Sequence, residues 1–78
     1  MASPHFPKKT LAAMKARGIS ESFAVDTFNS GEHFLTSRGS HMMVKKYESV
    51  GYEITLYYVL DNSTGRPIVT GAWKRSLA

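Results

Sequence analysis

The sequence of 78 residues contains no cysteine and no long apolar run, and both absences narrow what the protein can be. Without cysteine there is no disulfide framework, no thiolate metal site and no thiol nucleophile. No stretch approaches the roughly 18 apolar residues of a membrane span, and the N-terminus lacks the hydrophobic centre of a signal peptide. We therefore expect a soluble, cytoplasmic domain, without a membrane partner, that depends on packing or on a binding partner for its stability.

Recognised metal and nucleotide motifs are also absent. The sequence has no G-x-x-x-x-G-K-[ST], no G-x-G-x-x-G after a strand and no H-E-x-x-H. Its three histidines, His5, His33 and His41, fall on three different predicted elements, so we predict neither a metal ion nor a cofactor. His33 is expected to be structural. His41 lies in RGSHM at 38–42, which resembles a tag-cleavage remnant but fits a natural turn between two strands.

Charge of one sign is missing from long stretches of the chain. Residues 1–18 contain no acid and residues 19–36 contain no base, while residues 37–78 contain six bases and three acids, a net charge of +3. Blocks of this kind create a patterned surface field that can steer a polyanion such as nucleic acid. The alternative is a basic domain whose charges only keep it in solution.

Two helices are predicted in the first thirty residues. Pro7 suits the first turn of a helix and Gly18 suits the residue after its end, which predicts a helix over 7–17 with its basic residues facing outward. Ser20 is a candidate N-cap for a second helix over 21–30.

From residue 32 onward the apolar period changes from 3.6 to 2, which is typical of strands. The predicted strands cover 32–37, 41–49, 52–60 and 68–75. Their short links favour an antiparallel meander with the helices packed on one face. The sequence therefore predicts an α+β fold, with two N-terminal helices on a four-stranded antiparallel sheet in the order ααββββ. One domain covers 1–78, with residues 1–5 as a flexible N-terminus.

The strand over 52–60 has one fully apolar face, which we expect to form the core against the two helices. The predicted core consists of Ile54, Leu56, Tyr58 and Leu60 on the strand, and of Leu11, Met14, Phe23 and Phe28 on the helices. Tyr52 shares this apolar face and is expected in the core as well, whereas the place of Tyr57 is open.

The remaining polar residues are sufficient for RNA cleavage without a metal. A base removes the 2′-hydroxyl proton, cations hold the charge that develops on the phosphate, and an acid protonates the leaving oxygen. His5 and Lys9 share one side of the first helix if its first turn extends back past Pro7, and they reach the end of the last strand if that strand lies beside this helix. The candidate catalytic residues are His5, Lys9, Thr70, Lys74 and Arg75.

Other basic and aromatic residues are candidates for RNA binding. Tyrosines interleaved with lysines can stack bases on a sheet face, or they can be half-buried strand residues. The basic face of the first helix either binds phosphates or is merely solvated, and Trp73 either stacks on a base or lies in the core. The RNA-binding candidates are Lys8, Lys15, Arg17, Lys45, Lys46, Tyr47 and Trp73.

The order of FPKKTLAAMKARGISESFAVDTFNSGEHF, a tyrosine-containing strand pair and PIVTGAWKR resembles the small toxin-like domains grouped with barnase, EndoU, colicin D and RelE, the BECR superfamily. The resemblance implies a helix pair on a four-stranded sheet and metal-independent cleavage of tRNA or mRNA that leaves a 2′,3′-cyclic phosphate. It also implies a cognate antitoxin or immunity protein, and in some cases delivery into a target cell within a larger secreted toxin. Related sequences carry a histidine where Lys9 stands, so the general base is open between His5 and Lys9, or activity is lost.

The sequence thus predicts a ribonuclease toxin that acts on RNA. The alternative is a non-catalytic RNA- or protein-binding module of the same fold, such as a phage or mobile-element protein that inhibits a host factor. The two readings differ in whether His5 and Lys9 converge with the cations at the end of the last strand.

Overall fold

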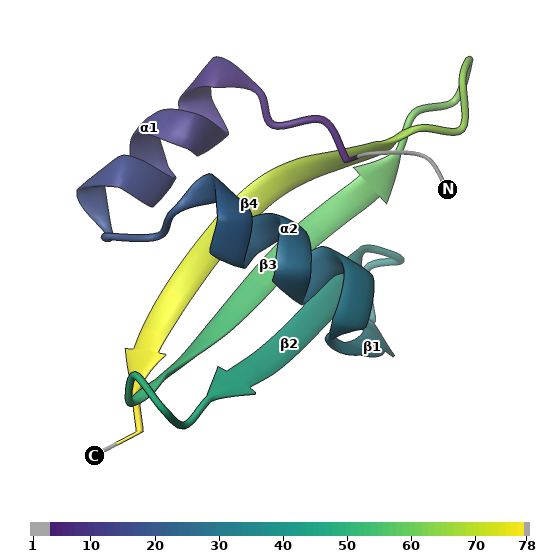
Figure 1. Ribbon diagram of the computed structural model, residues 1–78. Coiled ribbons are helices and arrows are strands. Elements are labelled where there is room, and N and C mark those ends of the chain that lie inside the picture. Colours follow the sequence, from purple (N-terminus) through teal and green to yellow (C-terminus); the bar gives the residue numbers. More distant parts are fainter. Residues whose placement is uncertain (1–3, 78) are drawn as a thin grey trace.

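The computed structural model describes residues 4–77, which form two helices packed on one face of a four-stranded sheet (Figure 1). The elements are α1 (Lys8–Ala16), α2 (Glu21–Ser30), β1 (Glu32–Leu35), β2 (His41–Tyr47), β3 (Tyr52–Leu60) and β4 (Pro67–Ser76). The strands lie in the order β1-β2-β3-β4, and every neighbouring pair is antiparallel. The predicted α+β fold and its ααββββ order are confirmed. Within residues 4–77 neither helix is long and apolar enough to cross a membrane.

Local sequence signals mark the end of α1 and the start of α2. Gly18 has a φ of 70°, a left-handed conformation that glycine adopts without strain, and the next backbone N–H, of Ile19, bonds back to the carbonyl of Met14. The hydroxyl of Ser20 accepts a hydrogen bond from the backbone N–H of Phe23 and so caps the start of α2. The two helices are therefore separated by a short link that the sequence itself encodes.

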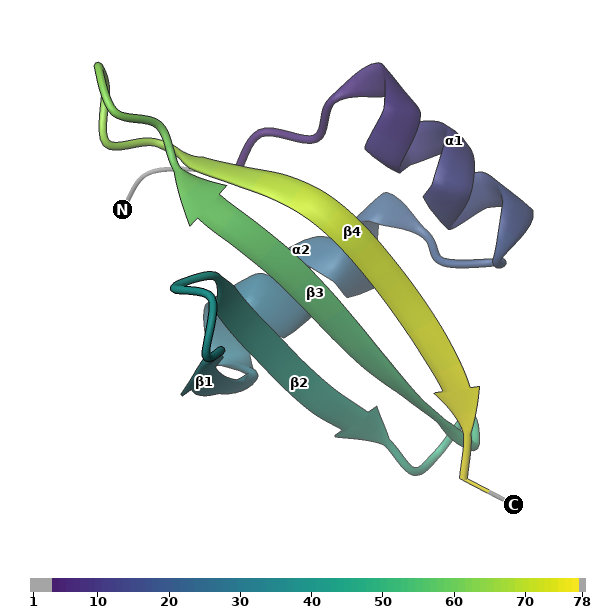
Figure 2. The same ribbon diagram turned by 180° about the vertical axis from the view of Figure 1, so that it is seen from behind.

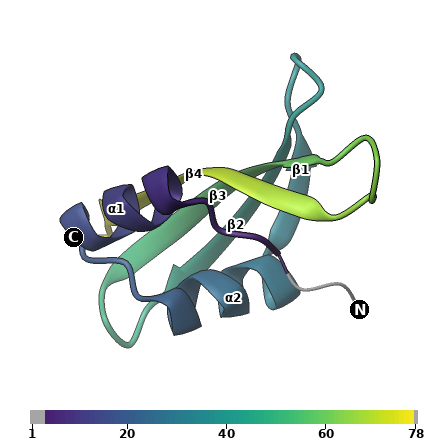
Figure 3. The same cartoon turned by 90° about the horizontal axis from the view of Figure 1, so that it is seen from above.

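The helices divide the covered face of the sheet between them. α1 packs on β4, whereas α2 packs on β2 and β3, and Figure 3 shows both on the same side of the sheet. The buried hydroxyl of Thr10 donates to the backbone carbonyl of Val69 at 2.7 Å and ties α1 to β4. The opposite face of the sheet carries no helix (Figure 2).

The core lies between this sheet face and the two helices. Ile54 and Leu56 are fully buried, as predicted, and Met14 reaches them from α1. Leu60 was predicted to join them, but it is 49% exposed. That prediction is wrong because the end of β3 extends beyond α2, toward the turn that leads into β4 (Figure 1), so no helix covers this position.

The remaining predicted core residues surround this centre. The following side chains are partly buried against it: Leu11, Phe23, Phe28, Tyr52 and Tyr58. Aromatic edge-to-face contacts join α2 to the sheet, with ring centroids 4.8 Å apart for Phe23 and Tyr47 and 5.1 Å apart for Phe28 and Tyr58. Such pairs add to the area that the rings bury and hold α2 at one position on the sheet.

A bulge interrupts the pairing of β3 with β4. Tyr57 lies opposite Gly71 but Tyr58 lies opposite Val69, so Thr70 has no opposite residue. The extra residue reverses the alternation of side chains beyond it. Val69 and Ala72 are both fully buried on the helix side although they are three residues apart.

The segment before α1 is held against β4. The backbone N–H of His5 donates to the carbonyl of Pro67, and the N–H of Val69 donates to the carbonyl of His5, both at 2.9 Å. Pro4 is buried. Of the segment over 1–5 that was expected to be flexible, His5 is therefore paired with a strand and Pro4 is buried, while residues 1–3 lie outside the described part of the chain.

The packing of β3 predicts a large difference between two leucines on the same strand. Leu56→Ala should lower the free energy of unfolding by about 2–5 kcal/mol, because it removes buried apolar area and leaves a cavity. Leu60→Ala, the matched control, should change it by less than about 0.5 kcal/mol because Leu60 is half exposed. Urea denaturation of both variants measures this difference, and equal losses would contradict the burial of Leu56.

Candidate nucleic-acid interface

The predicted catalytic residues do not meet in one cleft. α1 begins at Lys8, after an extended Pro7, so its first turn does not reach back to His5. His5 pairs instead with Ile68 at the start of β4, and its side chain is exposed beside the turn that precedes that strand. Lys74 lies six residues further along the strand, a separation of about 20 Å. His5 lies outside α1, so it does not share one side of this helix with Lys9.

The other three candidates point in different directions. Lys74 and Arg75 are consecutive strand residues and so lie on opposite faces of the sheet. Arg75 forms an ion pair of 3.0 Å with Glu53, and Lys74 donates to the carbonyl of Gly18 at 3.3 Å at the end of α1. The hydroxyl of Thr70, in the bulge, donates to the backbone carbonyl of Tyr57. The carboxylate beside these cations is Glu53, and it already pairs with Arg75.

A basic edge does form where α1 packs on β4. The two segments that build this edge, residues 4–20 and 67–77, contain no aspartate or glutamate. α1 runs along β4 in the same direction, since Thr10 bonds to Val69 near its start and Gly18 to Lys74 at its end. We call the cations of these two segments the basic edge: Lys8, Lys9, Lys15, Arg17, Lys74 and Arg75.

Arg17 carries the basic edge around β4 to the uncovered face of the sheet. Its guanidinium lies 3.9 Å from the centroid of the Trp73 ring and donates to the backbone carbonyl of Ala72 at 3.5 Å. Trp73 is 52% exposed, so the alternative that placed it in the core is wrong. The bulge at Thr70 explains this, because the reversed alternation directs Ala72 to the helices and Trp73 to the open face.

A hollow of about 490 Å³ lies on this open face next to Trp73. Tyr57 of β3 lines it beside Trp73, and the turn between β1 and β2 forms the other wall. Figure 3 shows this turn projecting from the side of the sheet opposite the helices. The complete lining consists of Thr36, Ser37, Arg38, Ser40, Tyr57, Thr70, Gly71 and Trp73.

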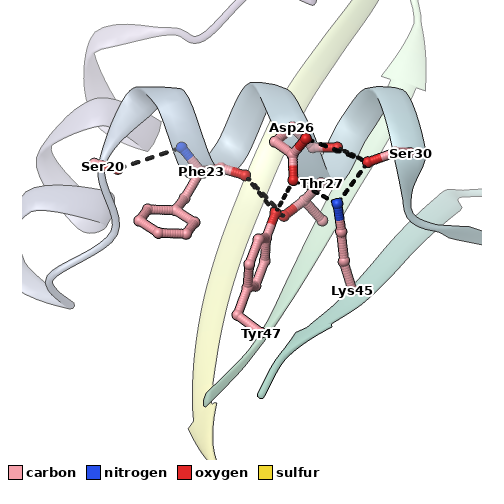
Figure 4. A network of polar contacts seen from close by, with 7 residues as sticks. All are labelled: Ser20, Phe23, Asp26, Thr27, Ser30, Lys45 and Tyr47. Atoms are coloured by element: carbon pink, nitrogen blue, oxygen red, sulfur yellow. Dashed lines mark hydrogen bonds and ion pairs between the residues drawn. The ribbon is translucent and has the colours of Figure 1, made fainter. Parts of the chain in front are cut away.

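Two predicted RNA-binding residues belong to a polar network that holds α2 on β2 (Figure 4). The ammonium of Lys45 donates to Asp26 at 2.6 Å and to Ser30 at 2.8 Å. The hydroxyl of Tyr47 lies 2.8 Å from both Thr27 and Asp26. Their polar atoms are already paired inside the fold, so we assign Lys45 and Tyr47 to docking of the helix and not to RNA.

This network shifts the pKa values of two of its members. Burial is the main cause that raises the pKa of Tyr47 to about 12, and the phenol therefore stays protonated as a hydrogen-bond donor. The hydrogen bond from Lys45 is the largest cause that lowers the pKa of Asp26, with a further hydrogen bond from Tyr47. The carboxylate is thus the charged acceptor on which the network converges.

A histidine pair on β1 and β2 escaped the sequence analysis. Nε2 of His33 lies 2.9 Å from Nδ1 of His41, and the His41 ring stacks on Tyr58 with centroids 4.8 Å apart. The antiparallel register brings the two histidines together diagonally, since His33 lies opposite Met43 and His41 lies opposite Leu35. Only the short link between the two strands could have indicated this register from the sequence. Among residues 4–77 no group of three or more histidine, cysteine, aspartate or glutamate side chains could hold a metal ion.

Comparison with protein-family models, with curated proteins and with solved structures finds no match to this chain. Of the features that the resemblance to the BECR superfamily implies, the structure shows only a small α+β fold, with two N-terminal helices and a four-stranded antiparallel sheet.

The network around Asp26 predicts a specific response to acid. In the folded state the pKa of Asp26 lies below its ordinary value of 3.8. The stability that the carboxylate contributes is therefore present above pH 3.8, and it is lost as the pH falls through the lower pKa of the folded state. Asp26→Asn should therefore lower the thermal midpoint at pH 7, and the difference from the wild type should shrink below about pH 4.

Glu48→Gln is the matched control for this measurement, because Glu48 is exposed in the turn after β2. It should leave both the midpoint and its pH dependence unchanged. A wild type and an Asp26→Asn variant with parallel midpoints from pH 7 to pH 3 would contradict the role of the carboxylate.

Proposed function

We propose that the protein binds RNA, without cleaving it, through the basic edge formed by α1 and β4. The single observation that carries this proposal is the separation of charge in the folded chain. All cations of the basic edge lie on two packed elements that contain no carboxylate in their sequence. A surface with one sign of charge attracts the phosphates of a nucleic acid, and their neutralisation releases bound counterions.

The arrangement of individual side chains supports this proposal. Lys8, Lys9 and Lys15 are exposed along α1, so their ammonium groups can reach phosphates without rearrangement of the fold. Arg17 and Lys74 extend the line of charge beyond the end of α1, where both contact backbone carbonyls. Arg75 contributes less because Glu53 already neutralises it.

The same geometry favours binding over catalysis. A general base must lie within hydrogen-bond reach of the proton that it removes. His5 lies at one end of β4, and the cations that would stabilise the transition state lie about 20 Å away at the other. A lysine at position 9, where related toxins carry a histidine, fits a member of the BECR superfamily that has kept RNA binding and lost cleavage.

Charge reversal on α1 tests the RNA-binding surface. Lys15→Glu should weaken binding to single-stranded RNA by at least about fivefold at ~0.1 M salt, since one lost phosphate contact removes about 0.7 from the slope of log K against log salt. The loss should be similar for RNAs of different sequence, because phosphate contacts carry no sequence information.

Lys46→Glu is the matched control, since it makes the same change in net charge on β2, outside the basic edge. Lys46 is a predicted RNA-binding residue, but it lies opposite Glu53 and not on α1 or β4, so we assign it no phosphate contact. It should leave both affinity and salt slope close to those of the wild type. Fluorescence anisotropy at several salt concentrations measures both quantities. Equal effects of the two variants would show that only net charge matters and would reject the basic edge.

Incubation with RNA tests the absence of cleavage. The purified protein with total tRNA and ribosomal RNA in EDTA should leave both intact, and His5→Ala should behave as the wild type does. Products that end in a 2′,3′-cyclic phosphate, lost in His5→Ala or Lys9→Ala, would instead establish the ribonuclease reading. If the protein neither binds nor cleaves RNA at any salt concentration, the RNA-binding proposal is rejected in favour of a protein-binding module.

A further inference from the structure

We propose that the hollow on the open face of the sheet holds an unpaired base of the bound RNA, stacked against Trp73 and Tyr57. This inference rests on the proposed function and deepens it, because it selects single-stranded RNA over duplex RNA. The basic edge alone would bind either form through its phosphates. An aromatic hollow next to it can accept only a base that is free to leave a stack.

Two aromatic side chains form the apolar part of the hollow. Tyr57 and Trp73 come from neighbouring strands and lie on either side of Gly71. A Cβ atom at Gly71 would lie 3.7 Å from Nε1 of Trp73 and 3.7 Å from Cδ2 of Tyr57. Because glycine has no Cβ atom, the space between the two rings stays empty down to the backbone of β4. A planar base is the kind of ligand that fits against such rings.

Arg17 connects this hollow to the basic edge. Its guanidinium covers one face of the Trp73 ring at 3.9 Å, and the ring nevertheless remains 52% exposed. The contact holds the ring in place and puts a positive charge beside it. A strand whose phosphates follow α1 would therefore place its next base at Trp73 without crossing an acidic surface.

The polar lining of the hollow matches the edge of a base. Hydroxyl groups from the β1–β2 turn and from the bulge can donate as well as accept hydrogen bonds, and Arg38 adds a cation at the tip of the turn. Thr36 already accepts a bond from the backbone N–H of Ser40, and Thr70 donates to Tyr57, which fixes the positions of these two hydroxyls. None of the lining residues is an acid.

Another hollow on the described surface is a poorer place for RNA. It lies at the edge of the sheet near β1 and contains two carboxylates, Glu32 and Glu53, together with Lys45 and Lys46. Phe34 is its aromatic residue, and it is 42% exposed. The carboxylates would repel a phosphate backbone. Phe34 therefore serves as an aromatic control outside the proposed base site.

Fluorescence reports on the site directly because Trp73 is the one tryptophan of the chain. A short uridine oligomer should quench this fluorescence, whereas an abasic oligomer of the same length should bind more weakly and leave the fluorescence unchanged. Tyr57→Ala should weaken binding of the uridine oligomer by about five- to a hundredfold, the range found when one base loses an aromatic partner. Its affinity for the abasic oligomer should stay the same.

Two matched variants separate stacking from a general loss of structure. Tyr57→Phe retains the ring and should bind as the wild type does, and Phe34→Ala removes an exposed ring outside the hollow and should also bind normally. Circular dichroism checks that every variant is folded. If Tyr57→Ala is unfolded, Gly71→Val tests the same point by filling the space between the rings, and it should weaken binding of the uridine oligomer alone.

Three results would overturn the inference. Equal affinity for the uridine and abasic oligomers, with Lys15→Glu still weakening both, would leave RNA binding in place and remove the base site. Uridine 5′-monophosphate bound as tightly as the oligomer would make the hollow a site for a free nucleotide and not for a strand. No binding of any RNA would reject the proposed function itself.

Discussion

The bulge that Thr70 introduces into the pairing of β3 and β4 is the constraint on which the two faces of the sheet depend. One residue without an opposite partner reverses the alternation of every side chain beyond it. Ala72 is consequently buried in the core, and Trp73 faces away from the helices. A regular strand would keep Val69, Gly71 and Trp73 on one face, and the exposed aromatic surface would not exist.

The edge of β4 brings the two halves of the candidate interface together. α1 packs on this strand through the buried hydroxyl of Thr10, and the outer face of the helix is therefore left to its lysines. Arg17 follows α1 and reaches around the strand to the Trp73 ring. The basic edge and the exposed Trp73 ring thus adjoin each other, although one belongs to the helix layer and the other to the open face of the sheet.

The same packing gives several predicted site residues partners within the fold. Lys45 and Tyr47 look like members of a basic, aromatic strand face, but α2 lies above them and supplies Asp26 as their partner. His5 looks like a residue of the first helical turn, but Pro7 starts the helix later and the preceding backbone pairs with β4. In each case a partner distant in the sequence decides the role, and a pattern within one segment contains no information about that partner.

The elements, their order and the separation of charge follow from the sequence alone. Caps at Gly18 and Ser20 and the change of apolar period at residue 32 are local signals, because they depend on backbone conformation and on which side chains alternate. Which cations lie together and where Trp73 points become evident only in the folded chain. These depend on strand register and on one bulge, which are set by the summed packing of the whole sheet against two helices, so no single stretch of the chain encodes them.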